Sequence, residues 1–190
     1  MLTPSEILEY VFCPRFTFFL NVLRISQKEE KRYKVRKGRE LHGRRSRKNP
    51  GYLRKRLGVV KRWTDVYLAS PSLHARGIVD EVLELEDGSM APLDYKMTFP
   101  RERPFRTHRV QLALYGLLIA DAWQRPVRRG YLVYTRGGNS VCPIDLTDRD
   151  FKRVRRTIGE VIDIIANGHL PARTRFPQRC LDCCYANICV

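Results

Sequence analysis

Residues 77–96 read GIVDEVLELEDGSMAPLDYK and contain the most informative pattern in the chain. The apolar and β-branched residues on either side of its DG dipeptide predict two strands joined by a tight turn. In a strand, residues i and i+2 lie on the same face, so Asp94 and Lys96 point the same way while Tyr95 points into the other layer. If the hairpin places Asp80 beside Asp94, two carboxylates meet with one ammonium group close by.

Two carboxylates at that distance repel each other unless a divalent cation lies between them. Hard oxygen ligands favour Mg²⁺ or Mn²⁺. Lys96 could then orient or deprotonate an attacking water, or neutralise charge on a phosphate oxygen. Taken alone, the pattern fits an ordinary surface Asp–Lys pair on a strand better than a catalytic site, so the rest of the chain has to distinguish catalysis from structure.

Strands and helices alternate on both sides of the hairpin. Thr3-Pro4-Ser5-Glu6 predicts the start of a helix that runs towards Cys13-Pro14, and Thr147 predicts the cap of a long amphipathic helix that ends at Gly168. The other expected elements are strands at 59–70, 73–87 and 90–99, an apolar helix at 108–124, and strands at 128–137 and 140–146. This order, in a chain of 190 residues, predicts a single α/β or α+β domain.

Positive charge is concentrated in residues 28–62. This segment has sixteen Lys and Arg against three Glu, which is +13 of the net charge of +16 that the chain carries. A polyanion is the natural partner, with phosphate contacts supplying affinity; the alternative is a solvated basic face. We expect a helix at about 34–47. Three aromatic residues nearby either stack on bases or belong to the core: Tyr33, Tyr52 and Trp63.

Four cysteines lie within RCLDCCYANICV, residues 179–190. The N-terminus has no basic and apolar signal sequence, and the longest apolar run, 112–120, is too short to span a bilayer, so we expect a cytoplasmic protein. Thiols are reduced in that compartment, and clustered cysteines there are typical of metal ligands rather than disulfides. Four thiolates suit an iron-sulfur cluster or a tetrahedral zinc.

Two further features complete the pattern. Gly38-Arg39-Glu40-Leu41-His42 puts a histidine on a predicted helix ahead of the strands, and Gln111 and Tyr115 lie at i and i+4 on the apolar helix. The chain resembles the RecB-like nucleases of the PD-(D/E)XK superfamily in the order of six elements. These are the early cysteine, the G-x-x-x-H helix, the G-x-x-D strand, the D-x-K strand, the Q-x-x-x-Y helix and the C-terminal cysteines. The chain resembles in particular the CRISPR-associated iron-sulfur exonucleases that work in spacer acquisition.

This resemblance implies a RecB-like nuclease core with a central mixed sheet flanked by helices, and an iron-sulfur module that joins the two termini. The core would cover residues 28–170, and the module residues 1–27 and 171–190, within one domain. The implied ligands of Mn²⁺ or Mg²⁺ are His42, Asp80, Asp94 and the carbonyl of Tyr95, and the implied catalytic residues are Asp80, Asp94 and Lys96. Gln111 and Tyr115 would position DNA or the active-site shell, although Tyr115 would otherwise be assigned to the core.

The family pattern also assigns the cysteines. The implied ligands of a 4Fe-4S or 2Fe-2S cluster are Cys13, Cys180, Cys183 and Cys189. Cys184 departs from the pattern, because it could replace Cys183 as the ligand, while Cys142 is interpreted as a small buried hydrophobe. A cluster bound at both ends of the chain would close a long loop, so we expect its role to be mainly structural. The remaining histidines, His74, His108 and His169, match no element and are interpreted as structural.

By this resemblance, the expected function is a metal-dependent DNA exonuclease that trims single-stranded ends, 5′ to 3′, during CRISPR spacer acquisition. Its expected partners are single-stranded DNA and the CRISPR integrase complex, with no membrane. The alternatives are a non-catalytic DNA-binding module, which would bind without cleaving, and a zinc-ribbon adaptor of a nuclease or integrase complex, which would contain zinc and no iron.

Overall fold

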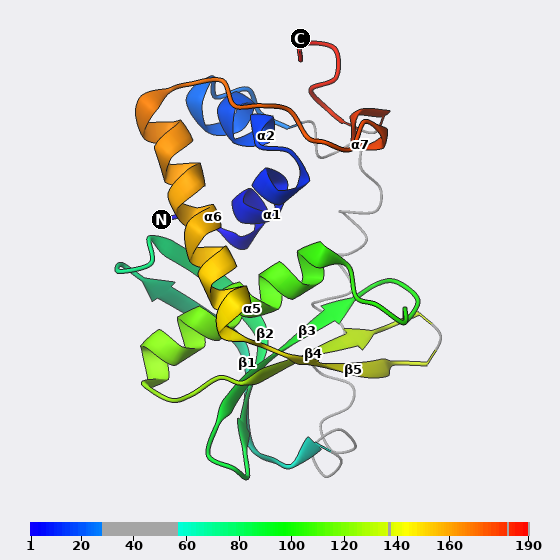
Figure 1. Ribbon diagram of the computed structural model, residues 1–190. Coiled ribbons are helices and arrows are strands. Elements are labelled where there is room, and N and C mark those ends of the chain that lie inside the picture. Colours follow the sequence, from blue (N-terminus) through cyan, green and yellow to red (C-terminus); the bar gives the residue numbers. More distant parts are fainter. Residues whose placement is uncertain (28–56, 137, 182, 190) are drawn as a thin grey trace.

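A five-stranded mixed sheet packs beneath the described helices in the view of Figure 1. This computed structural model describes residues 1–27, 57–136, 138–181 and 183–189. The strands lie in the order β1-β2-β3-β4-β5, and only β3 and β4 run parallel. Their bounds are β1 Val59–Ser70, β2 Ala75–Leu85, β3 Met90–Lys96, β4 Arg129–Tyr134 and β5 Ser140–Asp145.

The hairpin of β2 and β3 opens into a fork at one end. The two strands pair from Glu84 and Met90 as far as Glu81 and Leu93, where their ladder ends. Beyond that point β3 continues alongside β4, up to the pairing of Lys96 with Tyr134. The fork therefore leaves the last residues of β3 accessible to side chains from β2.

Helix α5, Arg106–Trp123, connects the two parallel strands and packs on the sheet. An unbroken run of residues from Leu112 to Ile119 is buried, which explains why this part of the helix is apolar on all sides. Strand β2, on which α5 packs, contains Gly77. A Cβ atom at this position would lie 2.9 Å from Pro4 Cγ and 3.4 Å from Tyr115 Cε1. Glycine thus allows Tyr115 and the N-terminal residues to approach the strand closely.

Helix α6, Asp148–Asn167, packs against α5 and extends to the N-terminal helices (Figure 1). Thr147 and Asp150 form a capping box at its start, and Gly168 ends it in the left-handed conformation. Arg109 of α5 forms an ion pair with Asp150, with 2.7 Å between Nε and Oδ1. This pair fixes the beginning of α6 to the beginning of α5.

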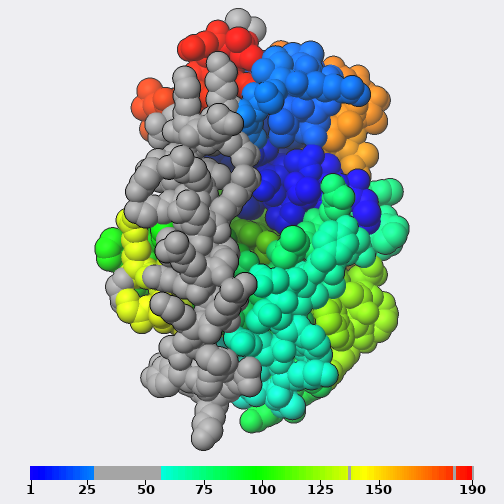
Figure 2. Space-filling model, turned by 180° about the vertical axis from the view of Figure 1, so that it is seen from behind, coloured from blue at the N-terminus to red at the C-terminus, as the bar shows by residue number. Residues whose placement is uncertain are grey.

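The N-terminal helices and the C-terminal segment meet at one end of the molecule. Helix α1, Pro4–Phe12, is followed by the short helices α2, Arg15–Thr17, and η1, Phe18–Val22, and the C-terminal part contains α7, Gln178–Leu181. Figure 2 shows the C-terminal segment in red beside the N-terminal segment in blue. Leu2 and Ile7 belong to the main core, whereas Cys13, Phe16 and Phe19 form a separate apolar cluster with Tyr185.

The expected α/β architecture is confirmed, and each strand and helix predicted within the described residues is present. Trp63 packs on Trp123, with 5.7 Å between ring centroids, and so supports the core assignment for this ring. The π-helical turn η1 and the short α7 were not expected. The predicted helix at 34–47 lies outside the described residues, as do Tyr33 and Tyr52. Among the described helices, none has both the length and the apolar character needed to cross a membrane.

Candidate active site and cysteine cavity

Asp80 lies at the fork between β2 and β3. Its Oδ2 atom accepts a hydrogen bond of 2.9 Å from the backbone N–H of Tyr95. The ladder between β2 and β3 has ended at this point, so the Asp80 carboxylate, rather than a backbone carbonyl of β2, accepts the hydrogen bond from this N–H of β3. Asp80 is partly buried, so it joins the two motifs of the hairpin while it remains accessible.

Asp94 and Lys96 form an ion pair on the face that packs against α5. Lys96 Nζ lies 2.6 Å from Asp94 Oδ2, and the two side chains are 16 % and 1 % exposed. A carboxylate so well removed from water needs a positive neighbour, because burial alone would favour its neutral form. Lys96 supplies that charge at the end of β3.

Gln111 links the ion pair to helix α5. Its Oε1 accepts a hydrogen bond of 2.6 Å from Lys96 Nζ, and its Nε2 donates to Asp94 Oδ1 at 3.4 Å. The same Nε2 lies 3.0 Å from the hydroxyl of Tyr115, one turn further along the helix. Burial, followed by the negative charge of Asp94, raises the pKa of Tyr115, so this hydroxyl stays protonated. Four polar side chains are thus held in one connected arrangement.

The other face of the sheet supports the same strand. Tyr95 donates a hydrogen bond of 2.8 Å to Glu81 Oε1, and Arg62 of β1 lies 3.0 Å from that oxygen. Glu81 is 2 % exposed, and burial raises its pKa against the opposing effects of Tyr95 and Arg62. This network fixes the residue between Asp94 and Lys96 from behind, and the sequence pattern did not identify Glu81 or Arg62.

His108 lies one turn before Gln111 on α5. Its ring packs between Phe105 and Tyr134, with centroid distances of 5.2 and 6.3 Å. Burial, and then the charge of Lys96, lower the pKa of His108 to about 4, so the imidazole is neutral at physiological pH. The structural interpretation of this histidine agrees with its packing, and its proximity to Lys96 was not visible in the sequence.

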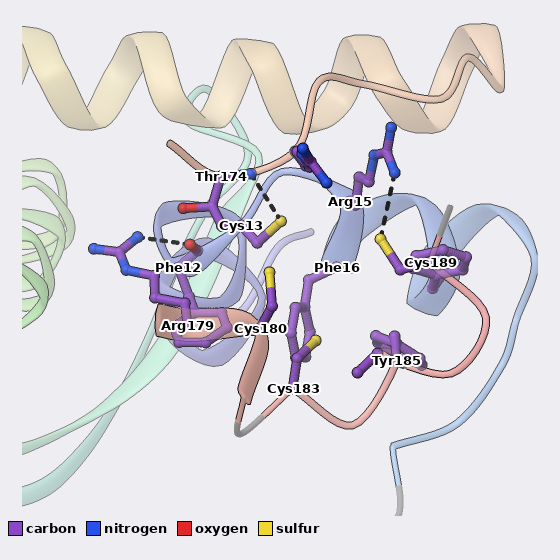
Figure 3. A pocket seen from close by; sticks show the side chains of 13 residues that line it. Phe12, Cys13, Arg15, Phe16, Thr174, Arg179, Cys180, Cys183, Tyr185 and Cys189 are labelled. Atoms are coloured by element: carbon purple, nitrogen blue, oxygen red, sulfur yellow. Dashed lines mark hydrogen bonds between the residues drawn. The ribbon is translucent and has the colours of Figure 1, made fainter. Parts of the chain in front are cut away.

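A second candidate site is a cavity of about 130 Å³ where the two ends of the chain meet (Figure 3). Cys13 reaches it because Pro14 disfavours a helical conformation in the residue before it, and Cys13 accordingly ends α1 in an extended conformation. The cysteine side chains that line the cavity are Cys13, Cys180, Cys183 and Cys189. These are the four that the family pattern assigns.

The four thiols are close enough to influence one another. The pKa of Cys183 is raised first by burial and further by the neighbouring Cys13, Cys180 and Cys189. In the described part of the chain, no three His, Cys, Asp or Glu side chains already stand at metal-binding distances from a common point. Nevertheless, four soft sulfur donors around one cavity have the chemistry that an iron-sulfur cluster or zinc requires.

Hydrogen-bond donors and aromatic rings surround these sulfur atoms. The N–H of Thr174 donates to Cys13 Sγ, and Arg15 donates to Cys189 Sγ, each at 3.4 Å. Arg179 binds the carbonyls of Val11 and Phe12 at the end of α1, at 3.0 and 2.6 Å. Donors to sulfur, such as the N–H of Thr174 and the guanidinium of Arg15, stabilise thiolates and would tune a bound cluster. The two arginines were missed, although each lies within two residues of an assigned cysteine.

The structure separates the remaining cysteines from this cavity. Cys184 is exposed and is not among the residues that line the cavity, while its neighbour Cys183 is. Cys142 lies on β5 and packs against the main core. His42, the remaining expected metal ligand, lies outside the described residues.

Comparisons with known proteins agree with this architecture. The chain is 26 % identical over 183 residues to the CRISPR-associated exonuclease Cas4 of Francisella tularensis subsp. novicida (strain U112), covering 95 % of this chain and 89 % of the relative. It is 25 % identical over 189 residues to the CRISPR-associated exonuclease Cas4 of Thermoproteus tenax, covering 99 % and 93 %. The resemblance inferred from the motifs is therefore confirmed.

The fold is also similar to a solved structure. The crystal structure of SSO0001 superimposes with a TM-score of 0.56 and 16 % identity, covering 99 % of this chain and 84 % of that one. The family model of the PD-(D/E)XK nuclease superfamily matches residues 26–190, which include the forked hairpin, the Gln111 helix and the C-terminal cysteines. The chain therefore belongs to the PD-(D/E)XK nucleases, a superfamily of enzymes that use divalent metal ions.

Proposed function

We propose that the protein is a metal-dependent exonuclease that degrades single-stranded DNA from its ends, in the 5′ to 3′ direction, as part of CRISPR spacer acquisition. The observation that carries this proposal is the fork of β2 and β3, where Asp80, Asp94, Lys96 and Gln111 lie together. The names of the two relatives support the exonuclease activity and the CRISPR context.

The proposed ligands of the divalent cation are Asp80, Asp94, the carbonyl of Tyr95 and His42. Their oxygen atoms and imidazole suit Mg²⁺ or Mn²⁺. When bound, the cation supplies Lewis-acid stabilisation of the negative charge that develops on the scissile phosphate. The fork fits such an ion because it brings a second carboxylate, Asp80, to the strand whose buried Asp94 already holds a cation, the ammonium of Lys96.

Lys96 is the proposed catalytic lysine. Its ammonium group can donate hydrogen bonds to a phosphate oxygen and orient the attacking water. Lys96 Nζ donates a hydrogen bond of 2.6 Å to Gln111 Oε1, and this bond limits the positions that the flexible lysine side chain can take. Tyr115 in turn positions the amide of Gln111, so two residues of helix α5 together fix the position of Lys96 on β3.

The cysteine cavity is the proposed site of an iron-sulfur cluster, with Cys13, Cys180, Cys183 and Cys189 as ligands. Its role would be to join α1 to the C-terminal segment, since its ligands come from both ends of the chain. We further propose nuclease core boundaries at 28–170 and a cluster module formed by 1–27 and 171–190. A cytoplasmic location and the CRISPR integrase complex as partner belong to the same proposal.

The test is cleavage of single-stranded DNA by anaerobically purified protein. Oligonucleotides labelled at either the 5′ or the 3′ end are incubated with Mn²⁺, with Mg²⁺ or with chelator. We expect degradation that requires the metal, that shortens the strand from its 5′ end, and that is lost in Asp94→Ala. The control is Asp87→Ala, which alters an exposed aspartate in the turn of the same hairpin.

The alternatives give different results. DNA binding without any metal-dependent cleavage, in a protein with its cluster intact, would support the non-catalytic module. Zinc without iron in the purified protein would support the zinc-ribbon adaptor. Degradation that survives Asp94→Ala would place the chemistry elsewhere in the chain.

A further inference from the structure

The loop between β3 and α5, residues 97–105, presents two exposed phenyl rings. Phe99 is 61 % exposed and Phe105 is 42 % exposed. The described part of the chain has four aromatic residues among its exposed large hydrophobics, and the other two are Tyr67 and Phe176. Two of these four rings therefore belong to one short loop, shown in green at the right of Figure 1.

Each phenyl ring has a guanidinium group near it. Arg101 Cζ lies 4.4 Å from the ring centroid of Phe105, and Arg136 Cζ lies 5.9 Å from that of Phe99. Arg103 is also exposed in this loop. An aromatic face beside a planar cation can stack on a nucleobase, while the guanidinium donors bind phosphate oxygens.

The loop begins directly at the candidate active site. Phe99 follows Lys96 by three residues, so their Cα atoms are at most about 11 Å apart. The N–H of Thr98 donates to the carbonyl of Lys96 at 2.8 Å, and the N–H of Arg136 donates to the carbonyl of Thr98 at 3.3 Å. These bonds connect the start of the loop to the end of β4 and determine where Phe99 emerges.

The other end of the loop is equally close to the site. Phe105 is the N-cap residue of α5 and precedes Gln111 by six residues, about 9 Å along a helix axis. Its ring also packs against His108, which lies between them on the helix. Pro100 and Pro104 restrict the backbone of the loop, which lowers the entropy cost of holding a ligand there.

We infer that Phe99 and Phe105, with Arg101 and Arg136, form a stacking surface for the unpaired bases next to the scissile phosphate of a single-stranded DNA end. The inference rests on the proposed nuclease function and adds the residues that would select unpaired DNA. Bases of a duplex are already stacked and paired, so the rings reach them only after unstacking. The surplus of arginine over acidic residues in and around the loop complements the phosphate backbone.

The test measures dissociation constants by fluorescence anisotropy, with the full chain in buffer without divalent cations. The probes are a labelled oligothymidine strand, an abasic strand of equal length, and a duplex. The variants are Phe99→Ala, Phe105→Ala and Phe99→Trp. Tyr67→Ala is the matched control, because Tyr67 is 59 % exposed, nearly the same as Phe99, and lies on β1.

We expect each alanine variant to bind oligothymidine roughly five- to a hundred-fold more weakly, the range for loss of one base–aromatic stack. Phe99→Trp should restore binding, and Tyr67→Ala should leave it unchanged. The abasic strand should bind wild-type protein and Phe99→Ala equally, because it has no base to stack.

Unchanged affinity of both alanine variants for oligothymidine would overturn the inference. So would an equal loss on the abasic strand, because the rings would then act on the backbone or on the fold. If wild-type protein degrades DNA while the phenylalanine variants bind normally, only this inference fails. If the variants lose binding but the wild-type protein cleaves nothing in any metal, the stacking surface stands and the nuclease proposal fails.

Discussion

The ammonium group of Lys96 lies 2.6 Å from Asp94 Oδ2, in a position where the carboxylate is almost completely removed from water. Two charges in such surroundings depend on each other, because removal of one leaves the other desolvated. Gln111 keeps the ammonium in place from helix α5. The same contact therefore contributes to the stability of the fork and holds the lysine within the proposed active site.

Replacement of Lys96 by methionine should reduce DNA hydrolysis by roughly 100-fold or more, as for other groups that stabilise transition-state charge. Without metal it should also lower the free energy of unfolding by up to about 3 kcal/mol, since Asp94 loses its cation. Mn²⁺ should raise the melting temperature of Lys96→Met more than that of wild type, because the ion would replace the ammonium. Thermal melts with and without Mn²⁺ measure this.

Lys152→Met is the control for that comparison, because Lys152 is exposed on α6 and lies outside the basic segment 28–62. It should leave both activity and the Mn²⁺-induced shift unchanged. A Lys96→Met protein with wild-type activity, or with no larger Mn²⁺ shift than wild type, would contradict the assigned role.

Replacement of Tyr95 by phenylalanine should affect stability more than catalysis. The hydroxyl of Tyr95 binds Glu81 on the face of the sheet away from α5, and its loss leaves a buried carboxylate with one donor fewer. We expect a decrease of about 1–3 kcal/mol in the free energy of unfolding, measured in urea. The activity of the folded fraction should change little, because the backbone N–H that Asp80 uses remains. A severe loss of activity in stably folded protein would contradict the assignment of the Tyr95 hydroxyl to stability rather than to catalysis.

Substitution of the cysteines should divide them into two groups. Alanine at Cys13 or Cys183 should abolish cluster binding and lower the melting temperature, because each side chain lines the cavity that joins the two ends of the chain. Alanine at Cys184 or Cys142 should leave the iron content unchanged. Iron analysis and visible absorbance of anaerobic protein measure this, together with thermal melts. A Cys13→Ala protein with wild-type stability would show that the cluster is not structural.

Acidification should destabilise the protein through His108. Its pKa falls from an ordinary value of 6.5 to about 4 in the folded protein, through burial and the charge of Lys96. Between these pH values the unfolded chain binds more protons than the folded one, so the free energy of unfolding decreases as pH falls from about 6.5 towards about 4. His108→Asn should show a weaker dependence on pH over this range, measured by urea denaturation at several pH values.

His74→Asn is the matched control for His108→Asn in these denaturation experiments. His74 is exposed and has a φ of 51°, a conformation that asparagine tolerates well. Its pH dependence should follow that of the wild type. If both variants behaved like the wild type, His108 would not be the group that couples folding to pH.

Local signals predicted much of the secondary structure. The capping pairs Thr3–Glu6 and Thr147–Asp150 begin α1 and α6 where the sequence indicated, because a cap depends only on residues three apart. The strand at 59–70 also has the expected bounds. By contrast, the π-helical turn at Phe18–Val22 has no simple local signature, because its geometry accompanies the packing of Phe16 and Phe19 against Tyr185, far away in the chain.

The spacing of residues in strands and helices determined which side chains share a face: Asp94 with Lys96, and Gln111 with Tyr115. Three further features became visible only in the folded chain: the two pairs meet, Asp80 binds the backbone of Tyr95, and Cys183 rather than Cys184 lines the cavity. The difference lies in the distance along the chain over which each signal acts. Periodicity acts within one element, whereas the fork, the burial of Asp94 and the joining of Cys13 to the C-terminal cysteines depend on how separate elements pack.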